Sequence, residues 1–204
     1  MRSPIDLTHR ADEVAPLLLG WVLRRGEVAL RLTEVEAYLG LDDPASHAYR
    51  GPRGRAATMF RAPGCLYVYL SYGVHRMANI VCSPAGSASA VLLRAGEVVA
   101  GVEIARHRRG RDEEPANHPV ARLASGPGNL GAVLGLDLAD DGARLGVEFS
   151  LEPGDSPSRT VMVGPRTGIS HAVDWPLRFW LADEPSVSPY RRSPRASRPA
   201  EDRL

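Results

Sequence analysis

The chain has 204 residues, a formal net charge of +1, 44% hydrophobic residues and 24% charged residues. These values are typical of one globular domain with a sizeable core, and no apolar run is long enough for a membrane-spanning helix. All 25 basic residues are arginine. This excludes any mechanism in which a lysine forms a Schiff base and leaves only the N-terminal amine for such chemistry.

The N-terminus and the two cysteines bear on location and on metals. The first ten residues, M-R-S-P-I-D-L-T-H-R, contain no apolar signal core, so we expect a cytoplasmic protein. Cys65 and Cys82 lack a C-x-x-C or Cys/His spacing, which argues against a structural zinc site. We expect both thiols to be reduced and buried.

The first predicted elements are a short helix over residues 12–19, limited by Pro16, and two strands within residues 20–32. A third segment, R-L-T-E-V-E-A-Y-L-G at 31–40, follows. In a strand, alternate side chains share a face, so Glu34, Glu36 and Tyr38 point one way and an apolar face points the other. Acids on a buried face are usually paired or functional, so this face can be a pocket floor. The alternative is the solvated face of an edge strand.

A window without acids comes next. Residues 44–96 contain no Asp or Glu, whereas the chain-wide composition predicts about six. The same window holds six arginines: Arg50, Arg53, Arg55, Arg61, Arg76 and Arg94. A basic block of this kind is typical of a surface that binds a polyanion, the alternative being a chance cluster on a solvated face. At its start, Asp43 or Ser46 can cap the short segment that carries His47.

Residues 64–83 predict a β-hairpin with the arms C-L-Y-V-Y-L and V-H-R-M-A-N-I-V-C. Tyr67 and Tyr69 share a face of the first arm, which is rich in strand-forming residues. Tyr72 precedes Gly73 at the tip, where we expect it to be exposed. Because arginines surround Tyr72 in the sequence, our hypothesis is that its ring inserts between DNA bases. The alternative is that the ring caps a local apolar cluster.

The remaining elements are predicted from periodicity and from Gly/Pro breaks. They are a buried strand at 88–95 closed by Arg94, a helix at 97–109, a helical turn at 119–124, a helix from the break at 125–128 to 134, strands at 144–151, 160–163 and 177–181, and a loop at 166–175. From Glu184 the chain is rich in Pro, Ser and Arg. We therefore expect one domain over residues 1–183 and a largely disordered tail over residues 184–204.

Taken together, these residues point to chemistry on a nucleic-acid base. Tyr38, His47 and Tyr69 could sandwich a displaced base, because every base has a π-face. Glu36 could activate water as a general base and so hydrolyse an N-glycosidic bond. The candidates for contacts with DNA are Tyr72, Arg50, Arg55 and Arg76.

Five motifs carry a resemblance to a known family. In order they are E-V-E-A-Y-L-G with D-D-P-A-S-H-A-Y-R-G, then P-G-C-L-Y-V-Y-L-S-Y-G-V-H-R-M-A-N, A-V-L-L-R-A, S-G-P-G-N-L and P-L-R-F. Their order and spacing, from about Val14 to Leu181, resemble the 3-methyladenine DNA glycosylase family of the alkyladenine (methylpurine) type. The resemblance implies a single mixed α/β domain: a curved, mainly antiparallel sheet, surrounding helices and a protruding DNA-intercalating β-hairpin. It implies no metal and no cofactor.

The resemblance also implies roles for particular residues. Glu36 matches the acid that activates the attacking water, and Arg94 matches the arginine that helps to hold that water and a nearby phosphate. Asn79 matches a residue that crowds the 2-amino group of guanine. The remaining matches concern the flipped nucleotide: Tyr38, His47 and Tyr69 stack on its base, and Tyr72 takes its place in the minor groove.

The implied activity is base excision repair on double-stranded DNA that contains damaged purines, chiefly 3-methyladenine. We expect a nucleoid-associated monomer without membrane contact. Since lysine is absent, we expect a monofunctional enzyme that leaves an intact abasic site. A non-catalytic nucleic-acid-binding module is one alternative, because it needs only the arginines and aromatics. A hydrolase of small nucleosides is another, because it would not need Tyr72 or the acid-free window.

Overall fold

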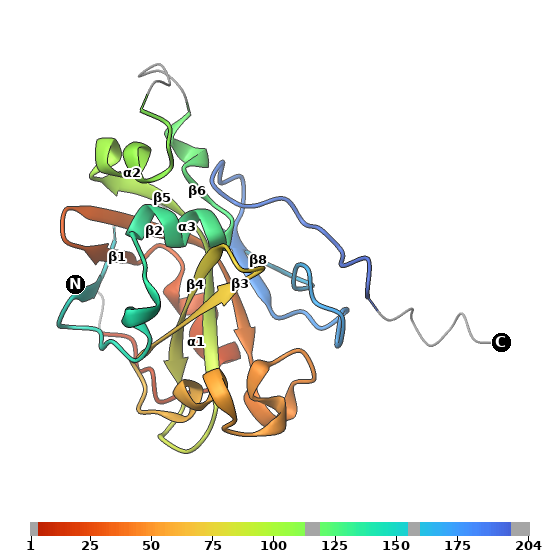
Figure 1. Cartoon of the computed structure of the whole chain (residues 1–204). Helices are drawn as coiled ribbons and strands as arrows, with labels where there is room; N and C mark the ends of the chain where they lie inside the picture. Colours follow the sequence, from red (N-terminus) through yellow and green to blue (C-terminus); the bar gives the residue numbers. More distant parts are fainter. Residues whose placement is uncertain (1–3, 113–118, 155–159, 197–204) are drawn as a thin grey trace.

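Strands β2 (Val28–Tyr38) and β5 (Ser89–Ala100) form the centre of the molecule and pair antiparallel along most of their length. Figure 1 shows them in the computed structural model, which describes residues 4–112, 119–154 and 160–196. The sheet runs in the order β3–β4–β5–β2–β1–β7 with antiparallel neighbours. The other strands have these bounds: β1 (Val22–Arg25), β3 (Leu66–Ser71), β4 (His75–Cys82), β6 (Ala124–Ser125), β7 (Phe149–Glu152), β8 (Val161–Gly164) and β9 (Arg178–Leu181).

Strand β2 shares its second edge between two partners. Its first part pairs with β1, and residues 34–36 pair with β9, which in turn pairs with β8. The register between β2 and β5 shifts on both sides of Glu34. Such bulges bend a strand and increase its twist. The sheet therefore curls, which confirms the predicted mixed α/β fold with a curved, mainly antiparallel sheet.

Side chains alternate between the two faces of this sheet. Val35 and Ala37 of β2 and Leu66 and Val68 of β3 belong to the main core, together with apolar residues of α1 and α3. Helix α2 packs against α3 (Figure 1). The helices and 3-10 turns have these bounds: α1 (Ala11–Leu18), α2 (Val102–Arg108), α3 (Pro127–Leu134), η1 (Gly40–Asp42), η2 (His47–Arg50), η3 (Gly54–Phe60), η4 (Val120–Arg122) and η5 (Leu138–Asp140). The opposite face of the sheet carries a second, smaller apolar cluster and the polar residues of β2.

The predicted hairpin is present as β3 and β4. The backbone N–H of Val74 donates to the carbonyl of Ser71 over 3.1 Å, and Tyr72 and Gly73 between them have φ values of 50° and 73°. Positive φ is uncommon for a residue other than glycine, and such positions cluster at functional sites. Tyr72 is 89% exposed, so the hairpin presents this ring to solvent.

Several boundaries differ from the prediction. The segment 97–109 is not helical throughout: β5 continues to Ala100, because Glu97 and Val98 pair with β2, and Gly101 (φ 70°) separates the strand from α2. Arg94 consequently lies inside β5 and does not close it. In the segment 144–151, a named strand begins only at Phe149. The predicted helix from the Gly-Pro break to residue 134 and the loop at 166–175 are confirmed.

The predicted disordered tail also differs from the structure in its first part. Glu184, Ser186 and Ser188 are buried. Each hydrogen-bonds a residue of β2, and these bonds give a Pro- and Ser-rich sequence a fixed place that its composition does not indicate. The last residues of the predicted tail, 197–204, lie outside the described part of the chain.

Candidate active site

The register of four strands creates a single row of side chains on the second face of the sheet. Glu36 on β2 faces Leu92 on β5, Leu92 faces Asn79 on β4, and Asn79 faces Tyr67 on β3. Directly opposed residues in an antiparallel sheet point to the same side. The row therefore connects an acid, an amide and an aromatic ring from segments far apart in the sequence.

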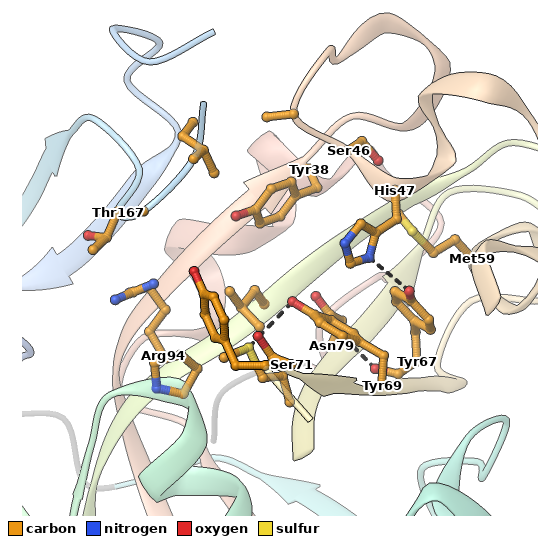
Figure 2. Close-up of a pocket in the computed structure, with 17 residues that line it drawn as sticks. Tyr38, Ser46, His47, Met59, Tyr67, Tyr69, Ser71, Asn79, Arg94 and Thr167 are labelled. Carbon is orange, nitrogen blue, oxygen red and sulfur yellow. Dashed lines mark hydrogen bonds between the residues drawn. The ribbon is translucent and has the colours of Figure 1, made fainter. Parts of the chain in front are cut away.

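A cavity of about 230 Å³ lies over this row. Its walls include six of the predicted site residues: Tyr38, His47, Tyr69, Tyr72, Asn79 and Arg94. Figure 2 shows that the cavity has two ends. His47 and Tyr67 lie at one end, while the hydroxyl of Tyr38 points toward the other, where Arg94 and Thr167 lie. The cavity thus combines an aromatic end with a polar end.

The aromatic end is held together by contacts between its rings. Ser46 caps η2 by accepting from the N–H of Ala48, and this places His47 Nδ1 2.9 Å from the Tyr67 hydroxyl. The His47 ring meets Tyr69 edge-on at a centroid distance of 4.7 Å, and Tyr67 and Tyr69 stack at 5.3 Å. Partial burial, with a smaller effect of the Arg55 charge, lowers the pKa of His47 to about 4. Near pH 7 this ring is therefore neutral.

Tyr67 was not among the predicted site residues, although strand alternation placed it on the same face as Tyr69. It is buried and hydrogen-bonds His47, so it orients the imidazole. Asn79 donates to the carbonyl of Tyr67 over 3.0 Å, which fixes the amide on the cavity floor. The sequence signal for Tyr67 was present, but its contact with His47 depends on how the η2 loop folds over the sheet.

Glu36 lies directly behind the polar end of the cavity. Its side chain is fully buried, and Oε2 accepts from the Tyr38 hydroxyl over 2.9 Å. Oε1 accepts from the backbone N–H of Thr167 over 2.7 Å and lies 3.2 Å from Nη1 of Arg94. Burial, with a smaller contribution from Glu36, raises the pKa of Tyr38 well above its usual value, so Tyr38 stays a donor.

These contacts do not occupy every hydrogen-bond acceptor position of the Glu36 carboxylate. An ionised carboxylate offers about four acceptor positions, and the donors named above, Tyr38, Thr167 and Arg94, occupy three of them. All three donor residues also line the cavity. These three residues separate the fully buried carboxylate from the cavity, and the fourth acceptor position, on Oε2, is the one at which a catalytic water would bind.

Glu34 has a different environment from Glu36. Its Oε1 lies 2.8 Å from Nε of Arg94 and 2.7 Å from Nε of Arg178. Burial alone would raise the pKa of Glu34, but the charges of Arg94 and Arg178 and hydrogen bonds from Ser188 hold it below the usual value. Burial likewise opposes the charge of Arg94, and the charges of Glu36 and Glu34 outweigh it and raise the Arg94 pKa. Both groups therefore stay charged at neutral pH.

Arg166 is another buried arginine near the site, and sequence reasoning missed it. Its guanidinium donates to both carboxylate oxygens of Asp43 and, over 3.0 Å, to the carbonyl of Ala37. It also lies 4.6 Å from the centroid of the Tyr38 ring. Arg166 thus ties the loop that carries Thr167 to β2 and supports the Tyr38 ring from behind.

The three arginines predicted to contact DNA are all exposed: Arg50, Arg55 and Arg76. Arg55 lies at the cavity, with its guanidinium 5.2 Å from the centroid of the Tyr69 ring. Arg76 lies on β4, close in sequence to the hairpin tip, and its Nη2 is 3.5 Å from a carboxylate oxygen of Asp137. Positive charge is therefore available both beside the cavity and beside the Tyr72 hairpin.

The described residues contain neither a metal-binding cluster nor a membrane-spanning helix. Within residues 4–112, 119–154 and 160–196, no three His, Cys, Asp or Glu side chains are grouped so that they could hold a metal ion. None of the helices in these same ranges has the length and apolar character needed to cross a membrane. The candidate site therefore consists of the aromatic, amide, acidic and arginine side chains already described.

Comparison with known proteins gives a consistent result. The family model described as "Methylpurine-DNA glycosylase (MPG)" matches residues 6–185. A relative from Cutibacterium acnes is 52% identical over 193 residues, which is 90% of this chain and 97% of the relative. A relative from Corynebacterium efficiens is 50% identical, with 94% and 98% covered, and one from Frankia casuarinae is 53% identical, with 86% of each covered. All three carry the name "Putative 3-methyladenine DNA glycosylase".

Proposed function

The chain belongs to the methylpurine-DNA glycosylase family, and from this premise we propose that it is a 3-methyladenine DNA glycosylase of base excision repair. The damaged purine leaves the DNA duplex, enters the aromatic cavity and loses its N-glycosidic bond by hydrolysis. One observation carries this proposal: a buried carboxylate, Glu36, lies behind a base-sized aromatic cavity and keeps an acceptor position for water. A non-catalytic binding module would have no use for that arrangement.

The cavity suits a purine that carries positive charge. The faces of Tyr38 and Tyr69 attract a cation through their ring quadrupoles. His47 is neutral near pH 7, since its pKa is lowered to about 4, so its ring does not repel an alkylated, cationic base. Such a base is also a good leaving group, because it becomes neutral when the bond breaks. Asn79 on the floor crowds the exocyclic 2-amino group that guanine carries and adenine lacks.

In the chemical step, Glu36 accepts a proton from the water while the water oxygen bonds to C1′ of the sugar. The electron pair of the bond between C1′ and the purine nitrogen moves to the purine, which leaves uncharged. Arg94 helps to hold the water. Its positive charge stabilises the partial negative charge on the water oxygen as the proton moves to Glu36. No lysine is available to attack the sugar. We therefore expect an intact abasic site as the product and no lyase activity, with the N-terminal amine as the one remaining group that could form a Schiff base.

Base release from defined duplexes tests this function. Duplexes that contain 3-methyladenine, 7-methylguanine, hypoxanthine or ethenoadenine are incubated with the protein, and free base is measured. We expect release of 3-methyladenine, an uncut strand, and no covalent complex after borohydride treatment. Binding to duplex DNA without release of any of these bases would support the non-catalytic module. Borohydride trapping would contradict the monofunctional mechanism.

Replacing Tyr72 by alanine should slow excision from duplex DNA about 10- to 100-fold, because the base gap left by flipping loses its aromatic filler. Folding stability should not change, since Tyr72 is 89% exposed and surface substitutions usually have small effects. The measurements are the excision rate under single-turnover conditions and the thermal unfolding midpoint.

Val74→Ala is the matched control for this prediction. Val74 is 65% exposed on the same hairpin tip, and its replacement removes apolar surface without removing a ring. We expect near-native excision from this variant. Equal rates for Tyr72→Ala and Val74→Ala would show that the tip does not act through the tyrosine ring.

A further inference from the structure

Residues 184–191 form a C-terminal strap that lies mostly beyond the family-model match, which ends at residue 185. The strap runs beside β2: Glu184 pairs with Arg31 over 2.9 Å, and the Ser186 and Thr33 hydroxyls are 2.8 Å apart. Figure 1 shows it as part of the blue segment that leads toward the C-terminus. Further on, the carbonyl of Arg191 accepts from the N–H of Gly168, a residue of the cavity wall, over 3.0 Å. The strap thus extends from the sheet to the rim of the candidate site.

Ser188 is the point where the strap meets the charged groups behind the cavity. Its N–H donates to Oε2 of Glu34 over 2.7 Å, and its hydroxyl donates to Oε1 over 3.0 Å. The same hydroxyl oxygen accepts from Nη2 of Arg94 over 3.2 Å. Its carbonyl accepts from Nη2 of Arg178 over 2.9 Å. Every polar group of this buried serine is therefore bonded to one network of side chains.

This network fixes the orientation of the Arg94 guanidinium relative to the Glu36 carboxylate. The Nε group of Arg94 is bonded to Glu34, Nη2 to Ser188, and only Nη1 faces Glu36, at 3.2 Å. Arginine and carboxylate groups prefer to pair through two parallel hydrogen bonds when they are free to do so. Without the hydroxyl of Ser188, the planar guanidinium keeps only its Nε bond to Glu34 on that side. The whole group could then turn, releasing Nε and bringing Nη2 as well as Nη1 toward Glu36. A two-point pair would then cover the acceptor position that the water needs.

We propose that Ser188 is a positioning residue of the active site: it restrains Arg94 to a single contact with Glu36 and so keeps the carboxylate open to the attacking water. The C-terminal strap thus contributes one positioning residue, Ser188, to the candidate active site. This inference rests on the proposed glycosylase function and adds to it a residue that the family-model match does not include. Ser188 itself does not line the cavity.

The test compares Ser188→Ala with Ser186→Ala. Both variants remove a buried hydroxyl from the same strap, but the Ser186 hydroxyl contacts Thr33 and none of the charged groups. The rate of 3-methyladenine release and its KM are measured for each variant at temperatures where unfolding curves show both to be folded. Ser188→Ala should lower kcat about tenfold with an unchanged KM, the size expected for one hydrogen bond to a charged group.

Ser186→Ala should lower thermal stability and keep the native kcat and KM. Equal kcat values for the two variants would overturn the inference and assign the strap a role in stability alone. In that case the native protein would still release base, so the proposed function would stand. A native protein that releases no base would overturn the proposed function, and the inference with it.

Discussion

Replacing Glu36 by glutamine should lower the rate of 3-methyladenine release by about 10²- to 10⁴-fold, the contribution usual for a general base. The amide cannot take a proton from water, yet it has nearly the same shape as the carboxylate. Its oxygen can still accept from the N–H of Thr167, and its NH₂ group can donate to the Tyr38 hydroxyl. Arg94 keeps its bonds to Glu34 and Ser188. We therefore expect a folded, inactive protein.

The measurement is single-turnover base release, with duplex binding and the unfolding midpoint as companion readouts. Binding to DNA that contains 3-methyladenine should persist, since the stacking residues and exposed arginines are untouched. Full excision by Glu36→Gln would refute the assignment of Glu36 as the base. Loss of both binding and folding would instead mean that the buried carboxylate is structural.

Replacing Glu34 by glutamine should reduce stability, whereas Glu36→Gln reduces activity. We expect a loss of about 3–5 kcal/mol in the free energy of unfolding. Glu34 is fully buried and lies between the guanidinium groups of Arg94 and Arg178. A neutral side chain leaves these two positive charges close together without their shared counterion. Urea denaturation at pH 7 should show a lower midpoint with little change in slope.

The pH dependence of this loss follows from the Glu34 pKa. In the folded protein that pKa is lowered from 4.5, so the native carboxylate stabilises the fold fully above about pH 4.5. This stabilisation disappears as the pH falls through the folded pKa. The difference between Glu34→Gln and the native protein should therefore narrow below pH 4.5. A constant difference down to the lowest pH would show that the lost interaction is not ionic.

Glu97→Gln is the control for the Glu34 prediction. Glu97 also pairs with a buried arginine, Arg31, but its side chain is 42% exposed, and Arg31 keeps its second partner Glu184. Partly exposed pairs contribute less than about 1 kcal/mol. A similar loss of stability in both variants would mean that burial between two arginines is not what makes Glu34 important.

The local pattern of the sequence determined a good part of this fold. Period-two alternation in β2 and β3 separated the core residues from Glu34, Glu36, Tyr38, Tyr67 and Tyr69, because strand geometry allows only two directions. Gly73 located the hairpin turn and with it the exposed Tyr72. The acid-free window indicated exposed positive charge near the hairpin. These inferences need only neighbouring residues, and for that reason they agree with the structure.

Contacts between distant segments were decided only by the tertiary structure. Alternation placed Glu34 and Glu36 on one face but could not distinguish their environments, because their partners lie far along the chain: Thr167 is 131 residues from Glu36, and Ser188 is 154 residues from Glu34. The same holds for Arg166 and Asp43, which are 123 residues apart. Composition assigned the strap to disorder, since nothing local orders a Pro- and Ser-rich segment. Two buried arginines and one carboxylate order it, and they meet Ser188 only once the sheet has curled.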